Sequence, residues 1–231
     1  MVGTRGARAR SLRPALNAPR GAHVMAAMEW QWIAPVTIVA VVVGIIVFAI
    51  RWESGRAIAF REAWSSYALS RGLAYAAASG PWYRRQAAAI EGDVEGVPIR
   101  LDTYVVSTGH AHVTYTRVQS RLPRPVHARV CVTPRTVFTG LGERLGRETI
   151  RTSDPTFDRA MAVRSKSRET ALGAVDDAVR SRTLGIGRKV SMQVEGENLK
   201  IWWQGGESSP EILDAASRLA AALARSCARS S

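Results

Sequence analysis

Cysteine is nearly absent from this chain of 231 residues, which contains only Cys131 and Cys227. Two cysteines cannot form the set of disulfides that stabilises small secreted domains. They also lack the Cys-x-x-Cys spacing of a metal or redox pair. We therefore expect Cys131 to be a small core residue in a strand and Cys227 to be an incidental residue near the chain end.

Recognisable catalytic motifs are also missing. The chain has no Gly-x-Ser-x-Gly elbow, no His-Glu-x-x-His pair, and no cysteine close to a histidine with an orienting partner. Asp154 and Asp158 bracket a Pro-Thr-Phe segment, and Asp176 and Asp177 are adjacent on a predicted helix. Adjacent helical residues point about 100° apart, so these last two do not face one site. The sequence predicts no catalytic residue and does not require an enzyme.

The four histidines of the chain offer one candidate metal site. His110 and His112 point to the same side of an extended segment, and His127 lies in a neighbouring predicted strand. Three imidazoles on one face could bind zinc. No carboxylate or thiol at ligand spacing completes the set, so we favour solvent-facing histidines and predict no metal.

The loop from Gly140 to Arg147 is superficially similar to a glycine-rich phosphate loop. Such loops connect a strand to a helix whose N-terminal amides face the phosphate. Here no convincing apolar helix follows, and the Lys-Ser/Thr end of a P-loop is missing. We predict a flexible turn and no bound cofactor.

Lysine is scarce, because Lys166, Lys189 and Lys200 are the only three and every other basic residue is arginine. This bias is typical of a GC-rich genome. Basic residues outnumber acidic ones 32 to 19, and residues 51–231 keep 27 basic and 18 acidic residues, a net charge of +9. The excess is diffuse and favours any polyanion. No RNP-like or recognition-helix pattern accompanies it, so we expect no nucleic-acid partner.

One long hydrophobic run is present, and it dominates the N-terminal quarter of the chain. The 18 residues from Ile33 to Ile50 carry no charge. As a helix they cover about 27 Å, close to the hydrocarbon thickness of a bilayer. Trp30, Trp32 and Trp52 flank the run at interface positions. Residues 30–52 are therefore predicted to be a single-pass transmembrane anchor in the inner or plasma membrane, with lipid as one partner.

The anchor is predicted to remain uncleaved, because the run exceeds a signal-peptide core and no small-x-small site follows it. Residues 1–28 have the composition of a disordered tail or of translated upstream sequence. Five arginines precede the helix if translation starts at Met1, which directs the following domain outward. If translation starts at Met25 or Met28, Glu29 is the only charged residue before the helix. The domain is then directed to the cytoplasm, which we favour.

Residues 54–72 are predicted to be a juxtamembrane amphipathic helix. Phe60, Trp64 and Tyr67 fall at i, i+4 and i+7, and Gly72 is a C-terminal stop. One interpretation places this helix on the membrane surface with its aromatic side chains in lipid. The other packs it against its own domain.

Residues 73–226 are predicted to form a soluble α+β domain. Apolar residues alternate with polar ones in several short runs, which is typical of a meander with one wet face. We expect four to seven antiparallel strands packed with two or three helices. The expected strands are 88–93, 97–103, 112–119, 126–132, 159–164, 190–194 and 199–203, the last two as a hairpin. The expected helices are 168–182, capped by Ser167, and one opening at Ser208-Ser209-Pro210-Glu211.

Trp202 is a candidate for partner binding. Ile201 and Trp203 take the core face of the predicted strand, which leaves Trp202 on the other side beside Lys200. An outward tryptophan next to a lysine suits a partner surface or a stacked base. The alternative is that a helix covers this face of the sheet.

The segment Asp154-Pro155-Thr156-Phe157-Asp158, followed by Ala162-Val163-Arg164 and the helix from Arg168, resembles a family of bacterial membrane-anchored proteins of unknown function. In these proteins one or two membrane helices precede a soluble domain, and an Asp-Pro-x-Phe segment enters a strand and then a helix. The Ile90–Thr103 hairpin, with Gly92 and Gly96, fits the same picture. The resemblance extends over about residues 64–224 and implies no activity and no catalytic residue. A turn at Asp-Pro and a core anchor at Phe157 also explain the segment.

Three functional hypotheses follow. The leading one is a membrane-tethered, non-catalytic domain that binds or scaffolds a protein partner. The alternative is a membrane-bound hydrolase whose active site is too dispersed for the sequence to show. Nucleic-acid binding rests only on the diffuse positive charge.

Overall fold

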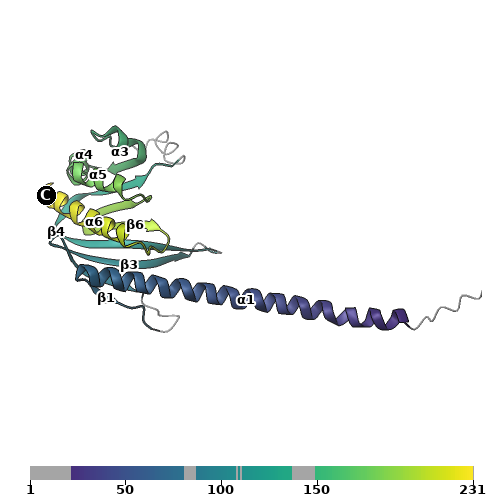
Figure 1. Ribbon diagram of the computed structural model, residues 1–231. Helices are drawn as coiled ribbons and strands as arrows, with labels where there is room; N and C mark the ends of the chain where they lie inside the picture. Colours follow the sequence, from purple (N-terminus) through teal and green to yellow (C-terminus); the bar gives the residue numbers. More distant parts are fainter. Residues whose placement is uncertain (1–21, 81–86, 108, 110, 137–148, 231) are drawn as a thin grey trace, which may run out of the picture. The chain divides into compact units, whose positions relative to one another are not determined.

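The computed structural model describes residues 22–80, 87–107, 109, 111–136 and 149–230. The chain divides into two compact units, residues 1–54 and residues 55–231. Helix α1 (Ala22–Arg71) contributes residues to both, since its first part belongs to the first unit and residues 55–71 to the second. Figure 1 shows the elements with their labels.

The predicted hydrophobic run is helical along its whole length, from Ile33 to Ile50. Its apolar side chains are exposed, with Ile38 at 63% and Phe48 at 66% of their full accessible area. Among the described residues, no helix is both long enough and apolar enough to cross a membrane. The side chains of residues 33, 34, 36 and 50 lie outside the described set. Membrane crossing therefore stays a prediction.

The second unit contains a six-stranded antiparallel sheet, within the predicted range of four to seven strands. Five strands follow in the order β1-β2-β3-β4-β5, and β6 pairs with the other edge of β4. The strands are β1 (Ala74–Ala76), β2 (Ala89–Val94), β3 (Val97–Ser107), β4 (His112–Pro134), β5 (Met161–Ser165) and β6 (Ser191–Gln204). The predicted β2–β3 hairpin is confirmed. Its turn places Glu95 and Gly96 at positive φ, 53° and 78°.

Helices cover one face of this sheet, which makes the second unit a two-layer α+β domain as predicted. They are residues 55–71 of α1, together with α3 (Pro155–Ala160), α4 (Arg168–Ala174), α5 (Asp177–Gly185) and α6 (Pro210–Ser230). Helix α6 contacts β3, β4 and β6, and α4 and α5 pack beside it (Figure 1). The predicted cap Ser167 accepts a hydrogen bond from the Thr170 amide, and Ser209 accepts one from Ile212.

The two interpretations of the 54–72 helix are resolved in favour of packing against the domain. Trp64 and Tyr67 are fully buried. The Trp64 indole donates a hydrogen bond to the Glu207 carbonyl at 2.7 Å, and the Tyr67 hydroxyl donates one to Ser217 Oγ at 3.2 Å. Trp64 and Tyr67 are therefore part of the domain core, and the partly buried Phe60 packs against it.

Several predicted boundaries are wrong. The segments 112–119 and 126–132 form one strand, β4, and the predicted hairpin of 190–194 and 199–203 is the single strand β6. Register shifts at Arg121/Val126 and Val126/Val130 absorb the extra residues of β4. The predicted helix 168–182 is broken at Asp176, which caps α5. Helix α3 extends to Ala160 and so includes the first two residues of the predicted strand 159–164, and β1 was not predicted.

Candidate functional site

The candidate zinc ligands do not converge in the part of the chain that is described. His112 and His127 are both exposed and both lie on β4, fifteen residues apart. At the rise of an extended strand fifteen residues span up to about 50 Å. No group of three potential metal ligands occurs in the described residues. His110 and the loop Gly140–Arg147 lie outside them.

The four candidate aspartates all have structural partners. Asp154 caps α3 by accepting hydrogen bonds from the Thr156 and Phe157 amides. Asp158 accepts hydrogen bonds from both the amide and the hydroxyl of Thr152. The fully buried Phe157 side chain confirms its predicted anchoring role.

The second aspartate pair belongs to helix α5. Asp176 caps it by accepting a hydrogen bond from the Val179 amide, and Asp177 pairs with Arg180. Burial alone raises the pKa of Asp176, but hydrogen bonds from Val179 and Ser226 and the positive charge of Arg229 hold it below its usual range. These aspartates stabilise helix ends and do not face one another across a site.

The expectation for Cys227 is wrong, and Cys131 lies in a strand, as expected, but not in the core. Cys227 belongs to the core on the inner side of α6, because that helix continues to Ser230. Burial, reinforced by the charge of Asp176, raises the pKa of its thiol to about 12. Cys131 is only half-buried and accepts a hydrogen bond from Arg129 Nε at 3.3 Å.

The strongest candidate site is the side of the sheet that faces away from the helices. Strand alternation places Val118, Ile201 and Trp203 on the helix side, where they are buried. Their neighbours point the other way, and antiparallel pairing aligns Asp102 with Arg117, Arg117 with Trp202, and Tyr104 with Tyr115. We call this surface the open sheet face. It is formed by Tyr104 on β3, Tyr115 and Arg117 on β4, and Lys200 and Trp202 on β6.

A buried carboxylate fixes the centre of the open sheet face. Asp102 accepts hydrogen bonds from Arg117 Nε at 2.9 Å and from Arg117 Nη2 at 2.8 Å, a bidentate pair. The Asp102 side chain is 8% exposed and that of Arg117 27%. A second arginine, Arg100, bridges Asp102 and Glu91. The hydrogen bonds that Arg117 donates to Asp102 raise the pKa of the Arg117 guanidinium, so Arg117 stays charged at every ordinary pH.

Aromatic rings flank this ion pair on both sides. The Arg117 guanidinium lies over the Tyr104 ring, 4.8 Å from its centroid, and Tyr104 stacks on Tyr115 with centroids 5.3 Å apart. Across the next strand, the Lys200 ammonium lies 5.3 Å from the centroid of the Trp202 ring. The arrangement fixes the rings while leaving part of each accessible.

The open sheet face is also hollowed. A depression of about 340 Å³ lies beside Arg117, Gln119 and Lys200. Another of about 520 Å³ lies between Arg100, Gln119 and Asn198. Both border Gln119, Ser120 and Asn198, just before the register shift between β4 and β6. A concave floor beside fixed aromatic and arginine side chains is suited to binding.

Comparison with known proteins gives no family. No family model matches the chain, and no curated protein matches it. The crystal structure of the mycobacterial trehalose monomycolate transport factor A, TtfA, is similar over 73% of this chain and 93% of that chain, with 14% sequence identity and a TM-score of 0.45. A TM-score this low supports no inference about function.

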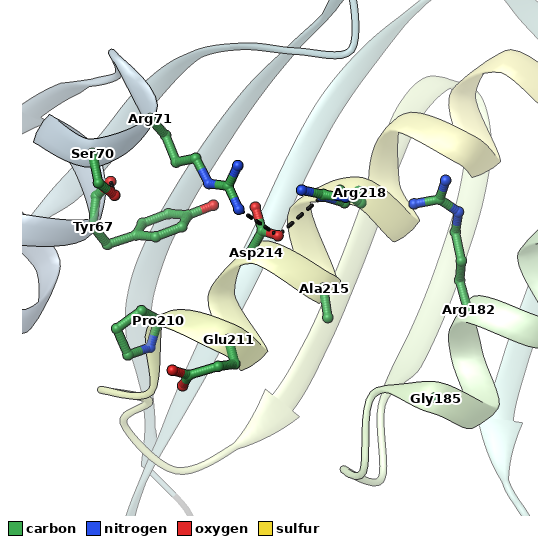
Figure 2. Close-up of a pocket in the computed structure, with 10 residues that line it drawn as sticks. All are labelled: Tyr67, Ser70, Arg71, Arg182, Gly185, Pro210, Glu211, Asp214, Ala215 and Arg218. Carbon is green, nitrogen blue, oxygen red and sulfur yellow. Dashed lines mark hydrogen bonds and ion pairs between the residues drawn. The ribbon is translucent and has the colours of Figure 1, made fainter.

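A further cavity lies on the helix side of the domain, and Figure 2 shows the residues that line it. Its volume is about 520 Å³. Three arginines reach it from three helices: Arg71 at the end of α1, Arg182 on α5 and Arg218 on α6. The hydrolase hypothesis gains no assembled set of catalytic groups from the described residues.

The structure places Trp202 on the outer face, as predicted, and α4, α5 and α6 do not cover it. Asp102, Tyr104 and Arg117, which share this face with Trp202, were not predicted from the sequence. The signal was available, because the alternation that buries Ile99 and Leu101 turns Asp102 and Tyr104 outward. Only the register in which β3, β4 and β6 pair brings these residues beside Trp202, and that register could not be predicted from the sequence.

Proposed function

We propose that this protein is a single-pass membrane protein whose α+β domain binds a protein partner through the open sheet face, without catalysis. The anchor is the helix over residues 30–52, and the domain faces the cytoplasm. The observation that carries the proposal is the exposed apolar surface of α1 between Ile38 and Trp52.

The exposed surface of α1 is extensive. Ten large apolar side chains between residues 38 and 52 are exposed, from 48% to 66% of their full area: Ile38, Val39, Val41, Val42, Val43, Ile45, Ile46, Val47, Phe48 and Trp52. A helix that is apolar all round is stable when it is buried in a core or in lipid. Removing one such side chain from water contributes about 1.5–3 kcal/mol, so a bilayer stabilises this segment by on the order of 10 kcal/mol or more.

The open sheet face supplies the side chains that dominate protein–protein binding. Trp, Tyr and Arg are the residues most enriched in binding hot spots. Here Trp202, Tyr104 and Arg117 are held in place by stacking and by the Asp102 ion pair, so little side-chain entropy is lost on binding. Within the described part of the chain Lys200 forms no ion pair, and its ammonium lies over the Trp202 ring, so we expect the bound protein to present a carboxylate there.

The test is co-purification of the full chain from membranes after gentle detergent extraction. We expect a partner at fixed stoichiometry with the wild type and its loss with Trp202→Ala. Arg168→Ala is the matched control, because Arg168 is exposed on α4, on the helix side of the domain and away from the open sheet face. If the chain elutes alone, or if both variants keep the partner equally well, the open sheet face is not the binding surface.

The hydrolase hypothesis is separable from this proposal. An activity screen of purified residues 54–231, with and without zinc, detects a dispersed active site. Turnover that survives Trp202→Ala would replace the binding proposal with an enzymatic one.

A further inference from the structure

The cavity on the helix side has an excess of positive charge. Arg71 Nη2 and Arg218 Nε both contact the same oxygen of Asp214, at 2.8 and 2.9 Å. Figure 2 shows these two guanidinium groups on either side of Asp214, with Arg182 projecting from α5 toward Arg218. One carboxylate therefore serves two arginines, and its charge balances only one of them.

The third arginine has only a distant counter-ion. Arg182 Nη1 lies 3.7 Å from Glu95 Oε1, which is beyond hydrogen-bonding distance. Glu95 is already bonded to Arg225, which donates to both its carbonyl and its carboxylate. That hydrogen bond, with the charges of Arg182 and Arg218, holds the pKa of Glu95 below its usual range, so the carboxylate is ionised and shared.

The remaining lining groups leave room for an anion. The Tyr67 hydroxyl is buried and bonded to Ser217, and burial raises its pKa, so it stays neutral. Glu211 lies at the exposed end of the cavity, where its carboxylate accepts a hydrogen bond from Ser209. Three guanidinium groups, balanced within the cavity by Asp214 and Glu211, still leave one positive charge. Like charges that line one cavity repel one another, and an anion bound between them offsets the repulsion.

We propose that this cavity binds a phosphate group, carried either by a soluble phosphomonoester or by a lipid headgroup. Guanidinium groups pair with phosphate oxygens through parallel hydrogen bonds. A phosphate offers three or four acceptor oxygens in a tetrahedron, so arginines approaching from three helices can each reach a different oxygen. A carboxylate offers two oxygens in one plane and matches this arrangement less well.

The site joins three segments that are distant in sequence. Arg71 ends α1, Arg182 belongs to the last turn of α5 and Arg218 to α6. An anion bound between them links these helices, so we expect binding to stabilise the domain by mass action. This surface is separate from the open sheet face, so the proposal does not depend on the proposed partner.

Equilibrium dialysis of the full chain in mild detergent against labelled inorganic phosphate tests the proposal. We expect saturable binding of about one phosphate per chain. Arg182→Gln and Arg218→Gln should each weaken binding by about tenfold or more, since each removes a charge-assisted hydrogen bond. Arg182→Lys, which keeps the charge but loses the planar fork, should weaken it less.

Arg229→Gln is the matched control. It removes the same charge from α6, but Arg229 pairs with Asp176 and does not line the cavity. We expect phosphate affinity within about twofold of the wild type. Circular dichroism of each variant separates lost binding from lost folding. Absence of saturable binding, or an equal loss with Arg229→Gln, overturns the proposal in favour of a general positive field.

Displacement of the labelled phosphate distinguishes the two sources. Glycerol 3-phosphate represents a soluble phosphomonoester, and phosphatidate in mixed micelles represents a headgroup, with phosphatidylcholine micelles as their control. Displacement by glycerol 3-phosphate alone assigns a soluble ligand, and displacement by phosphatidate alone assigns a lipid. Displacement by neither, or equally by phosphatidylcholine, contradicts a phosphate site.

Discussion

The ion pair between Asp102 and Arg117 is expected to contribute measurably to stability, unlike most surface pairs. The perturbation is a double-mutant cycle made from Asp102→Ala, Arg117→Ala and the combined variant. The cycle isolates the pairwise interaction, because the loss of packing in each single variant cancels. It tests whether the centre of the open sheet face is rigidly held.

The magnitude follows from burial and geometry. Two charge-assisted hydrogen bonds of 2.9 and 2.8 Å join the residues. The carboxylate is 8% exposed and the guanidinium 27%, so water screens the pair only partly. Hydrogen bonds to charged groups contribute about 1.5–3 kcal/mol each, and the residual exposure lowers their sum. We expect a coupling free energy of about 2 kcal/mol.

The matched control is the Arg121–Glu197 pair, which also joins an arginine of β4 to a carboxylate across the sheet. Its closest contact is 2.6 Å, but its side chains are 80% and 39% exposed. Exposed pairs contribute about 0.2–1 kcal/mol. Both cycles are measured by urea unfolding of the full chain in mild detergent, followed by far-UV circular dichroism. Equal coupling in the two cycles, or less than about 0.5 kcal/mol for Asp102–Arg117, refutes the reasoning.

Three further predictions concern other parts of the chain. Trp64→Phe leaves the buried Glu207 carbonyl without its indole donor, so we expect a loss of about 1–3 kcal/mol, visible as a lower Tm. Burial raises the pKa of Cys227 from 9.0 to about 12, so the folded state favours the neutral thiol. This preference adds to the free energy of unfolding in full below about pH 9, and the added stability is lost as the pH rises toward 12. In urea unfolding between pH 8 and 11, Cys227→Ala should therefore lose less stability than the wild type, and parallel curves would contradict this. A topology reporter fused to the C-terminus should be active in the cytoplasm when translation starts at Met28, and its activity outside would reverse the proposed orientation.

Local patterns predicted much of the fold. Alternation from Val97 to Thr103, with a glycine turn before it, located the β2–β3 hairpin. Ser167 marked the start of α4, and the buried Phe157 anchored the segment after the Asp-Pro turn. In each of these places the local preference and the tertiary packing agree.

The errors arose where tertiary pairing overrides a local stop signal. The predicted strands 112–119 and 126–132 are separated by Pro123 and Pro125, which lie in the stretch of β4 between the last β3 pair at Ser120 and the first β5 pair at Val130. A proline there breaks few ladder hydrogen bonds. Similarly, Gly196 appeared to be a hairpin turn, but it pairs with Val126 inside β6. Strand β6 continues through Gly196 because its partner β4 continues beside it.

The candidate sites were less predictable than the fold. Trp202 could be placed on the outer face from alternation alone. The arginine-lined cavity could not, because Arg71, Arg182 and Arg218 meet only through the packing of three helices. Asp214, which joins two of them, gave no sequence signal of its own.

Alkaline carbonate extraction of cell membranes tests the central claim, membrane anchoring by α1, most directly. The full chain is compared with Val42→Arg/Ile46→Arg, which places two charges on one side of the helix at a cost of about 2.5–3.5 kcal/mol each at the bilayer centre. We predict that the wild-type chain stays in the membrane pellet and that the double variant is released. Release of the wild type, or equal retention of both, would contradict the account.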